Sequence, residues 1–275
     1  MRWTCGLVGL VVSGVLAAGN AAAADFVPHT ARYRIEQAVT APRDMRTPGS
    51  LTTELNRTCA GFLWTWSMNY TVDRGKVAPG AGEQYEEVLT ASESGDGSAL
   101  DYTMRYRVGA RTVTAEGQAR FGKGDEPGTL AVKPANLAPD SRIQPHTLPP
   151  VALRLKLMDS LAANDRGPWI VQGMELLRFH RSNDYRVELV ETKAFPGAQP
   201  LPRGTPAQVP VDPNSLLKAK SATLKQTSYQ IAEWGDLIYT LHTNGLISRM
   251  AFKRNGIDVL AILQEASGFP APKCN

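Results

Sequence analysis

The 275-residue sequence is poor in the residue types that build metal and redox centres. It has three cysteines and four histidines, and no two histidines have the H-x-H or H-x-x-x-H spacing of a metal site. A C-x-x-C pair is also absent, so a zinc ribbon or a thiol-redox site is not predicted. We therefore expect neither a metal nor a cofactor.

Motifs of nucleophilic and phosphate chemistry are missing as well. The sequence has no G-x-S-x-G motif and no glycine-rich phosphate loop. A lone S-x-x-K match at Ser215–Lys218 has no second motif to support it. Glu86 and Glu87 are adjacent strand residues, so their carboxylates must point to opposite faces. We expect no catalytic residues and no enzymatic activity.

Neither one charge sign nor a long apolar run dominates the chain. The formal net charge of +4 is too small and too dispersed to predict nucleic-acid binding. The apolar run from Gly6 to Ala18 follows Arg2 and ends in small residues, which is typical of a signal peptide. It is shorter than the roughly 20 apolar residues of a membrane span. We predict a signal peptide over residues 1–24 and an exported protein that is not integral to the membrane.

Two cysteines, Cys59 and Cys274, remain once Cys5 is removed with that leader. In an oxidising compartment such a pair is most simply one structural disulfide. It would tie both ends of the mature chain together, which favours one domain over residues 25–275.

Alternation of apolar and polar residues is the main structural signal. It is clearest from Phe62 to Val72, where one face carries Phe62, Trp64, Trp66, Met68, Tyr70 and Val72. The same pattern predicts strands over 29–39, 51–58, 84–92, 100–108, 111–121, 129–132, 168–180, 184–192, 222–232, 237–242, 246–254 and 257–265. We expect turns at Glu93–Ser98, Arg181–Asn183, Asn244-Gly245 and Asn255-Gly256.

One segment, Thr147–Gly167, predicts a long helix. Pro149 and Pro150 suit its first turn, where their missing N–H groups would have no partner, with Thr147 or Leu148 near the cap. Apolar side chains cover about half of its circumference, and Arg154 lies within that arc. The alternation in its first turns would also fit a strand, but the length and the prolines favour a helix.

A sheet of roughly a dozen sequential antiparallel strands must curl or close to protect its edges. We predict a mainly β fold, a curled antiparallel sheet or incomplete barrel, with the long helix packed in or against it. The segment 195–213 holds six prolines and is expected to be a surface loop.

The aromatic face of Phe62–Val72 is either core or the wall of a ligand cavity. We take Trp64, Trp66 and Tyr70, together with Arg154 and Leu157 of the helix, as ligand-binding candidates. The arginine would snorkel to a rim, pair with a buried carboxylate or bind an anionic head group. The four histidines, His29, His146, His180 and His242, are expected to be structural or surface residues.

Short motifs are distributed along the mature chain: Val27–Tyr33 (VPHTARY), Gly49, Cys59–Phe62, the turn Ser94–Gly97, Glu116-Gly117, His146–Pro150, Asn244-Gly245 with Arg249, and Cys274. Together they resemble the EipB-like cell-envelope integrity proteins, which are periplasmic proteins of Gram-negative bacteria. The sequence departs from that pattern at Phe26-Val27, at Thr30 and in the proline-rich segment.

The resemblance implies a β-spiral of about fourteen antiparallel strands. It also implies a disulfide between Cys59 and Cys274, a periplasmic location, and a role in envelope integrity and tolerance of envelope stress. No enzymatic activity comes with it.

Our leading hypothesis is a non-catalytic periplasmic protein that maintains the envelope by binding an apolar, lipid-like or peptide ligand in its curled sheet. The ligand could be a segment of a lipoprotein or of another envelope protein. One alternative is an interaction scaffold with a sealed core, acting through its outer surface or the proline-rich loop. The other is a hydrolase that uses a histidine with a carboxylate.

Overall fold

A computed structural model describes the chain over residues 26–37, 49–72, 83–134, 142–175, 181–191, 213–229, 236–254, 257–270 and 272–274. The predicted signal peptide, the proline-rich segment up to residue 212, His180 and the Asn255-Gly256 turn fall outside these ranges. Within them, no helix has the length and apolar character needed to span a membrane.

The described strands form a single 14-stranded antiparallel sheet, which confirms the expected mainly β fold. They are β1 (His29–Gln37), β2 (Gly49–Arg57), β3 (Gly61–Val72), β4 (Glu83–Ser94), β5 (Ala99–Val108), β6 (Arg111–Arg120), β7 (Gly128–Lys133), β8 (Arg142–Ile143), β9 (Trp169–Glu175), β10 (Arg181–Leu189), β11 (Ser221–Ser228), β12 (Asp236–His242), β13 (Ile247–Arg254) and β14 (Ile257–Gly268). Sequence neighbours pair throughout, except that β8 and β9 are the two edges and β1 pairs with β14. The first and last strands therefore lie side by side in the middle of the sheet.

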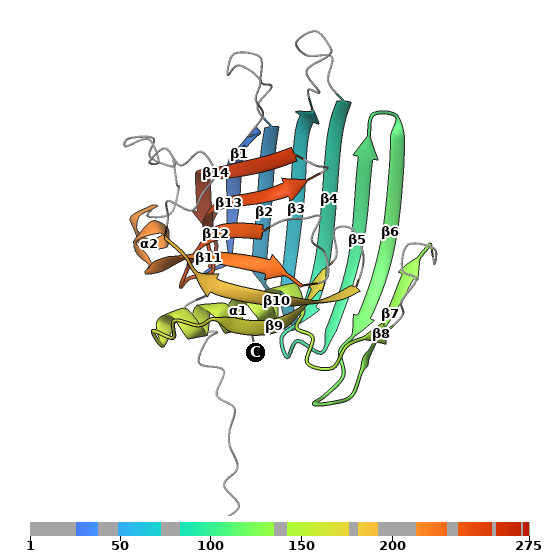
Figure 1. Ribbon diagram of the computed structural model, residues 1–275, viewed down its shortest axis with the longest axis vertical. Coiled ribbons are helices and arrows are strands. Elements are labelled where there is room, and N and C mark those ends of the chain that lie inside the picture. Colours follow the sequence, from blue (N-terminus) through green and yellow to red (C-terminus); the bar gives the residue numbers. More distant parts are fainter. Residues whose placement is uncertain are drawn as a thin grey trace, which may run out of the picture.

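The sheet curls over itself and remains open, as expected for an incomplete barrel. In Figure 1, β11–β14 cross in front of β1–β3 at a steep angle, and α1 lies beside β9 at one end. Inward side chains from both halves, such as Leu51 and Leu241, meet in one apolar core. Met174 of the edge strand β9 packs with Ile143 of the opposite edge strand β8, so the two edges of the curl lie close together.

The predicted helix is present as α1 (Pro150–Ala162), and its buried apolar side consists of Val151, Leu153, Leu157, Met158 and Leu161. Its N-cap is Pro149, so Leu148 lies directly before the cap, within the expected region. Leu148 is held by the sheet. Its N–H donates to the Gln172 carbonyl at 2.8 Å, and its own carbonyl accepts from the Met174 N–H at 3.0 Å. The edge strand β9 thus fixes where the helix begins.

Two further expectations are corrected, and two short elements were not predicted. Arg181–Asn183 form no turn but pair with Glu175–Gly173 of β9, because ladder hydrogen bonds outweigh the turn preference of Ser and Asn. Glu93 belongs to β4 rather than to a turn, since the inward alternation of that strand continues to it. The strand β8 and the helix α2 (Pro213–Lys218) were not predicted, because they are too short to show a period.

Cys59 and Cys274 lie at disulfide distance, with their Cα atoms 5.4 Å apart. The bond joins the turn between β2 and β3 to the segment that follows β14. It spans 215 residues of sequence and reinforces the pairing of the first and last strands.

We expect Cys59→Ala to lower the free energy of unfolding by about 2–4 kcal/mol, because the unfolded chain is no longer constrained by the cross-link. Denaturant titration without reductant measures this loss, and Cys274→Ala and the double variant should show the same loss. In Cys59→Ala the Cys274 thiol should become titratable. If both thiols of the wild-type protein react before reduction, the disulfide is absent.

Candidate functional site

The N-terminus of α1 is held by a carboxylate from a distant strand. No side chain of the helix's own N-cap residue satisfies its free N–H groups, and its first turn has no acidic residue. Instead, Glu93 of β4 accepts hydrogen bonds from the backbone N–H groups of Val151 at 2.8 Å and Ala152 at 2.7 Å. A negative charge at this end also matches the helix dipole. Glu93 therefore connects the helix to the wall of the curl.

Glu93 is only 2% exposed, and burial raises the pKa of its carboxyl group to about 7. The two backbone hydrogen bonds and the positive charge of Arg154 act in the opposite direction. The desolvation effect is the largest of these. The carboxyl group thus titrates near neutral pH while it holds the helix.

The turn between β4 and β5 lies beside the contact between Glu93 and the N-terminus of α1. Asp96 accepts hydrogen bonds from the hydroxyl groups of Ser94 and Ser98, both at 2.7 Å, and these bonds lower the pKa of Asp96 to about 2. Gly97 of this turn lies against Pro149 and Ala152 at the start of α1. On the other side, a Cβ atom at Gly61 would lie 2.0 Å from the Glu93 carbonyl oxygen, so only glycine permits this approach.

Arg154 places a positive charge on the inner side of the helix. Its guanidinium interacts electrostatically with Glu93 and with the hydroxyl groups of Tyr33 and Tyr239. Burial lowers the pKa of Arg154 and raises that of Tyr33 to about 12, so the arginine remains the cation and the tyrosine stays neutral. In the described part of the chain, Arg154 forms no hydrogen bond and no close ion pair. Its donor groups are thus available to another partner.

A cavity of about 200 Å³ lies between this helix turn and the ladder of β2 and β3. Arg154, Pro150 and Val151 form its helix side. Its sheet side is formed by residues of β2, β3, β4 and β9, namely Thr53, Glu54, Leu55, Trp64, Thr65, Trp66, Leu89 and Met174. We call this space the lumen cavity. Its lining is apolar apart from the cation Arg154, the two threonines and Glu54, whose carboxylate accepts a hydrogen bond from the Asn56 side chain. A cation in such surroundings suits an apolar group that carries a hydrogen-bond acceptor.

Three of the five predicted ligand-binding residues, Trp64, Trp66 and Arg154, line the lumen cavity. Tyr70 does not line it, because its ring stacks on Tyr85 with centroids 5.2 Å apart. Leu157 points into the core and is 2% exposed. Glu93 was not among the candidates, although its place in the inward alternation of β4 would have marked it as a buried carboxylate.

The indole N–H groups of Trp64 and Trp66 are buried and have no acceptor in the described structure. An unsatisfied buried donor costs about 1–3 kcal/mol. The two rings are therefore kept in place by packing, for example of Trp66 against Phe252. If a small rotation of either indole ring brought its N–H group to a hydrogen-bond acceptor, part of this free-energy cost would be recovered.

The described histidines are buried and hydrogen-bonded, or lie on the surface. His29 is 1% exposed, hydrogen-bonded to the Val27 carbonyl at 2.7 Å, and burial lowers its pKa to about 4. His242 bonds the Ser248 hydroxyl at 2.9 Å, but both residues are buried and neither lines the lumen cavity. His146 lies beside Asp125 at 3.1 Å on the exposed surface. Among the described residues, no group of His, Cys, Asp and Glu side chains could hold a metal ion.

The fold and the cavity define an open β-barrel-like protein with a helix inside its curl. A search of solved structures found the crystal structure of a β-barrel-like protein of the domain of unknown function DUF1849 from Brucella abortus. The two chains superpose with a TM-score of 0.67 at 15% sequence identity, over 89% of this chain and 99% of that one. At this identity the likeness shows a shared fold. No protein-family model and no curated protein sequence matches the chain.

The raised pKa of Glu93 makes its effect on stability depend on pH. Its contribution is fully present below pH 4.5 and is lost as the pH rises towards 7, because unfolding then releases a proton that the folded state still holds. The free energy of unfolding of the wild type minus that of Glu93→Gln should fall by about 3 kcal/mol across this range.

Denaturant titrations at several pH values measure this difference. Burial lowers the pKa of His29, so its titration changes the free energy of unfolding in the opposite direction. This change occurs in both proteins and cancels in their difference. Glu116→Gln, at an exposed position of β6, serves as the control and should show no such trend. A difference that rises with pH would mean that the helix N-terminus and Arg154 outweigh desolvation.

Proposed function

We propose that the protein is a distant relative of the EipB-like proteins and maintains the cell envelope from the periplasm without catalysis. The fold it shares with a DUF1849 protein supports the relationship, because DUF1849 is the domain class of the EipB-like proteins. The short motifs along the chain support it further. The predicted leader and the cysteine pair at disulfide distance support an oxidising location outside the cytoplasm.

The observation that carries a ligand-binding role is Arg154 in the lumen cavity. A guanidinium group has five donors, and an apolar lumen offers them few acceptors. Because Arg154 has no direct partner in the described structure, a bound acceptor would satisfy donors that otherwise face the cavity. The ligand would be an amphiphile, with an apolar body against Trp64 and Trp66 and a carboxylate or carbonyl group at the arginine.

The size of the lumen cavity limits what enters it. Typical small-molecule sites have volumes of roughly 300–1,000 Å³. At about 200 Å³ the lumen cavity takes only one end of a lipid-like or peptide ligand. The rest of such a ligand would extend along the partly exposed apolar residues that surround the core, such as Tyr106 and Phe252.

The small volume of the lumen cavity, about 200 Å³, also favours a second candidate, the interaction scaffold with a sealed core. Its function would lie on the outer surface or in the proline-rich segment 195–213. Deletion of that segment separates the two candidates. Lost complementation by a protein that still folds supports the scaffold, whereas full complementation rules out a scaffold that acts through this segment.

Loss of the gene should sensitise cells to detergents and to cell-wall antibiotics, because the proposed role is to maintain the barrier. Growth of the deletion strain on a panel of such agents, with the plasmid-borne gene as the control, measures this. Wild-type sensitivity to every agent would contradict the envelope role.

Arg154→Met should weaken the binding of dodecanoate, an apolar chain with one carboxylate, by about tenfold or more, because it removes the cation and keeps an unbranched apolar side chain in place of the arginine stem. Isothermal titration calorimetry measures the dissociation constant. Lys156→Met, on the exposed side of the same helix, is the matched control and should leave affinity unchanged. No binding by the wild type, or equal binding by Arg154→Met, would contradict the assigned site.

A further inference from the structure

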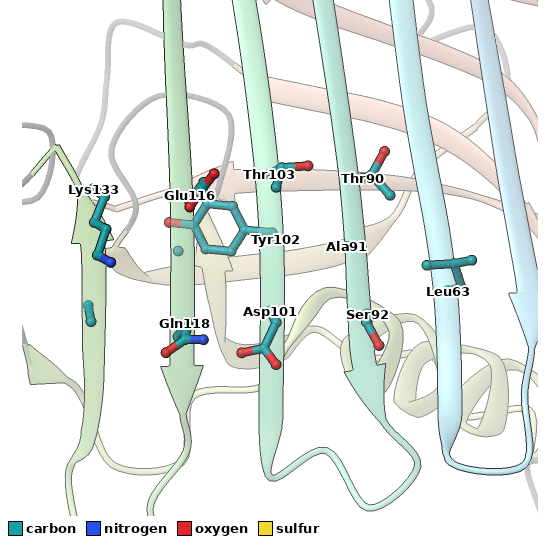
Figure 2. A pocket seen from close by; sticks show the side chains of 12 residues that line it. Leu63, Thr90, Ala91, Ser92, Asp101, Tyr102, Thr103, Glu116, Gln118 and Lys133 are labelled. Carbon is teal, nitrogen blue, oxygen red and sulfur yellow. The ribbon is translucent and has the colours of Figure 1, made fainter.

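A second hollow, of about 400 Å³, lies on the outer face of the sheet across β3–β7. Thr90, Thr103, Glu116 and Gln118 are on this face, since they alternate with the inward residues of their strands. Figure 2 shows these side chains, with Leu63 at one side of the hollow and Lys133 at the other. We call it the outer hollow. It lies on the opposite face of the sheet from the lumen cavity.

Small side chains at the middle of the five strands leave this space open. Ser92, Thr90 and Thr103 lie between the longer Leu63 on β3 and Lys133 on β7. Beneath them the ring of Tyr102 crosses Gly117, where a Cβ atom would come within 2.1 Å of the tyrosine Cζ atom. Tyr102 is 4% exposed, so its ring supports the hollow from the inner side and offers no aromatic platform to a ligand.

The charges around the outer hollow cancel. Asp101 pairs with Arg120 at 2.8 Å, and Glu116 lies opposite Lys133 in the register of β6 and β7. A ligand with a net charge of either sign therefore gains little overall attraction. Four of the remaining lining residues, Thr90, Ser92, Thr103 and Gln118, carry neutral hydrogen-bonding groups, and Leu63, Ala91 and Ala131 are apolar.

We propose that the outer hollow binds a neutral oligosaccharide. Hydroxyl, amide and carboxylate groups on neighbouring strands stand at spacings of roughly 5 Å across the sheet and 7 Å along it. This regular array offers donors and acceptors to a ligand that carries many hydroxyl groups over a similar area. Its volume lies within the range of roughly 300–1,000 Å³ that is usual for ligand sites, unlike that of the lumen cavity.

The proposal concerns binding and not hydrolysis. Glycoside hydrolysis needs one carboxylic acid whose environment keeps it protonated. Asp101 is about half exposed and engaged by Arg120, and Glu116 is exposed, so neither carboxyl group has an apolar environment. The outer hollow is therefore a recognition surface.

The test is calorimetric titration of the full-length mature protein with maltotriose, cellotriose and tri-N-acetylchitotriose. The wild type is expected to bind at least one of them with a dissociation constant of roughly 1 mM or lower. The double variant Thr103→Ala/Gln118→Ala removes two exposed hydrogen-bonding groups of the outer hollow and should weaken that binding by about tenfold.

The matched control is Thr112→Ala/Thr114→Ala, which changes two exposed residues on the same face of β6 outside the outer hollow. It should bind as the wild type does. The proposal is overturned if none of the three sugars binds, if the hollow variant binds with unchanged affinity, or if the control loses affinity equally. Any of these results leaves the lumen proposal intact, because that site lies on the other face of the sheet.

Discussion

The hydrogen bonds from the start of α1 to Glu93 are the interaction on which the rest of the interior depends. A helix whose N-cap and first residue are prolines, and whose first turn lacks an acidic residue, has little to stabilise its own N-terminus. The sheet supplies the missing acceptor from β4 and fixes Leu148, the residue before the N-cap, through a bridge to β9. Because one helix end is attached to both arms of the curl, its position sets how tightly the sheet wraps. The lumen cavity is the space that remains beside this attachment.

Several ionisable side chains are buried in the interior, and their charges compensate each other. Arg154 would be costly alone in an apolar lumen, and Glu93 provides the opposite charge without a direct ion pair. His29, also affected by the charge of Arg154, stays neutral because burial lowers its pKa to about 4. The tyrosines around the arginine stay protonated for the same reason. The lumen is therefore nearly neutral, and the donor groups of Arg154 face the lumen cavity.

Local periodicity was sufficient to predict most of this fold and part of the site. The strand that carries Trp64 and Trp66 and the helix that carries Arg154 each have a strong pattern of their own, so both were identified and both line the cavity. Glu93 was missed because its role depends on a contact with the helix 58 residues further along the chain. Tyr70 and Leu157 were predicted to bind a ligand but do not line the cavity. The sequence pattern identifies the apolar face of a strand or helix, but it does not show which residues of that face border a cavity. The outer hollow depends on the register of five strands, which no single segment encodes.

The pairing of β1 with β14 has a consequence for how the protein comes into being. These strands are neighbours in the middle of the sheet but are separated by almost the whole described chain. Contacts of such long sequence separation form slowly, because a large loop must close first. During synthesis the chain emerges from its N-terminus, so the edge of β1 that pairs with β14 stays open until the last strand has been made. Through that interval this edge offers unpaired backbone groups to other chains, which is the condition that favours aggregation of an incomplete sheet.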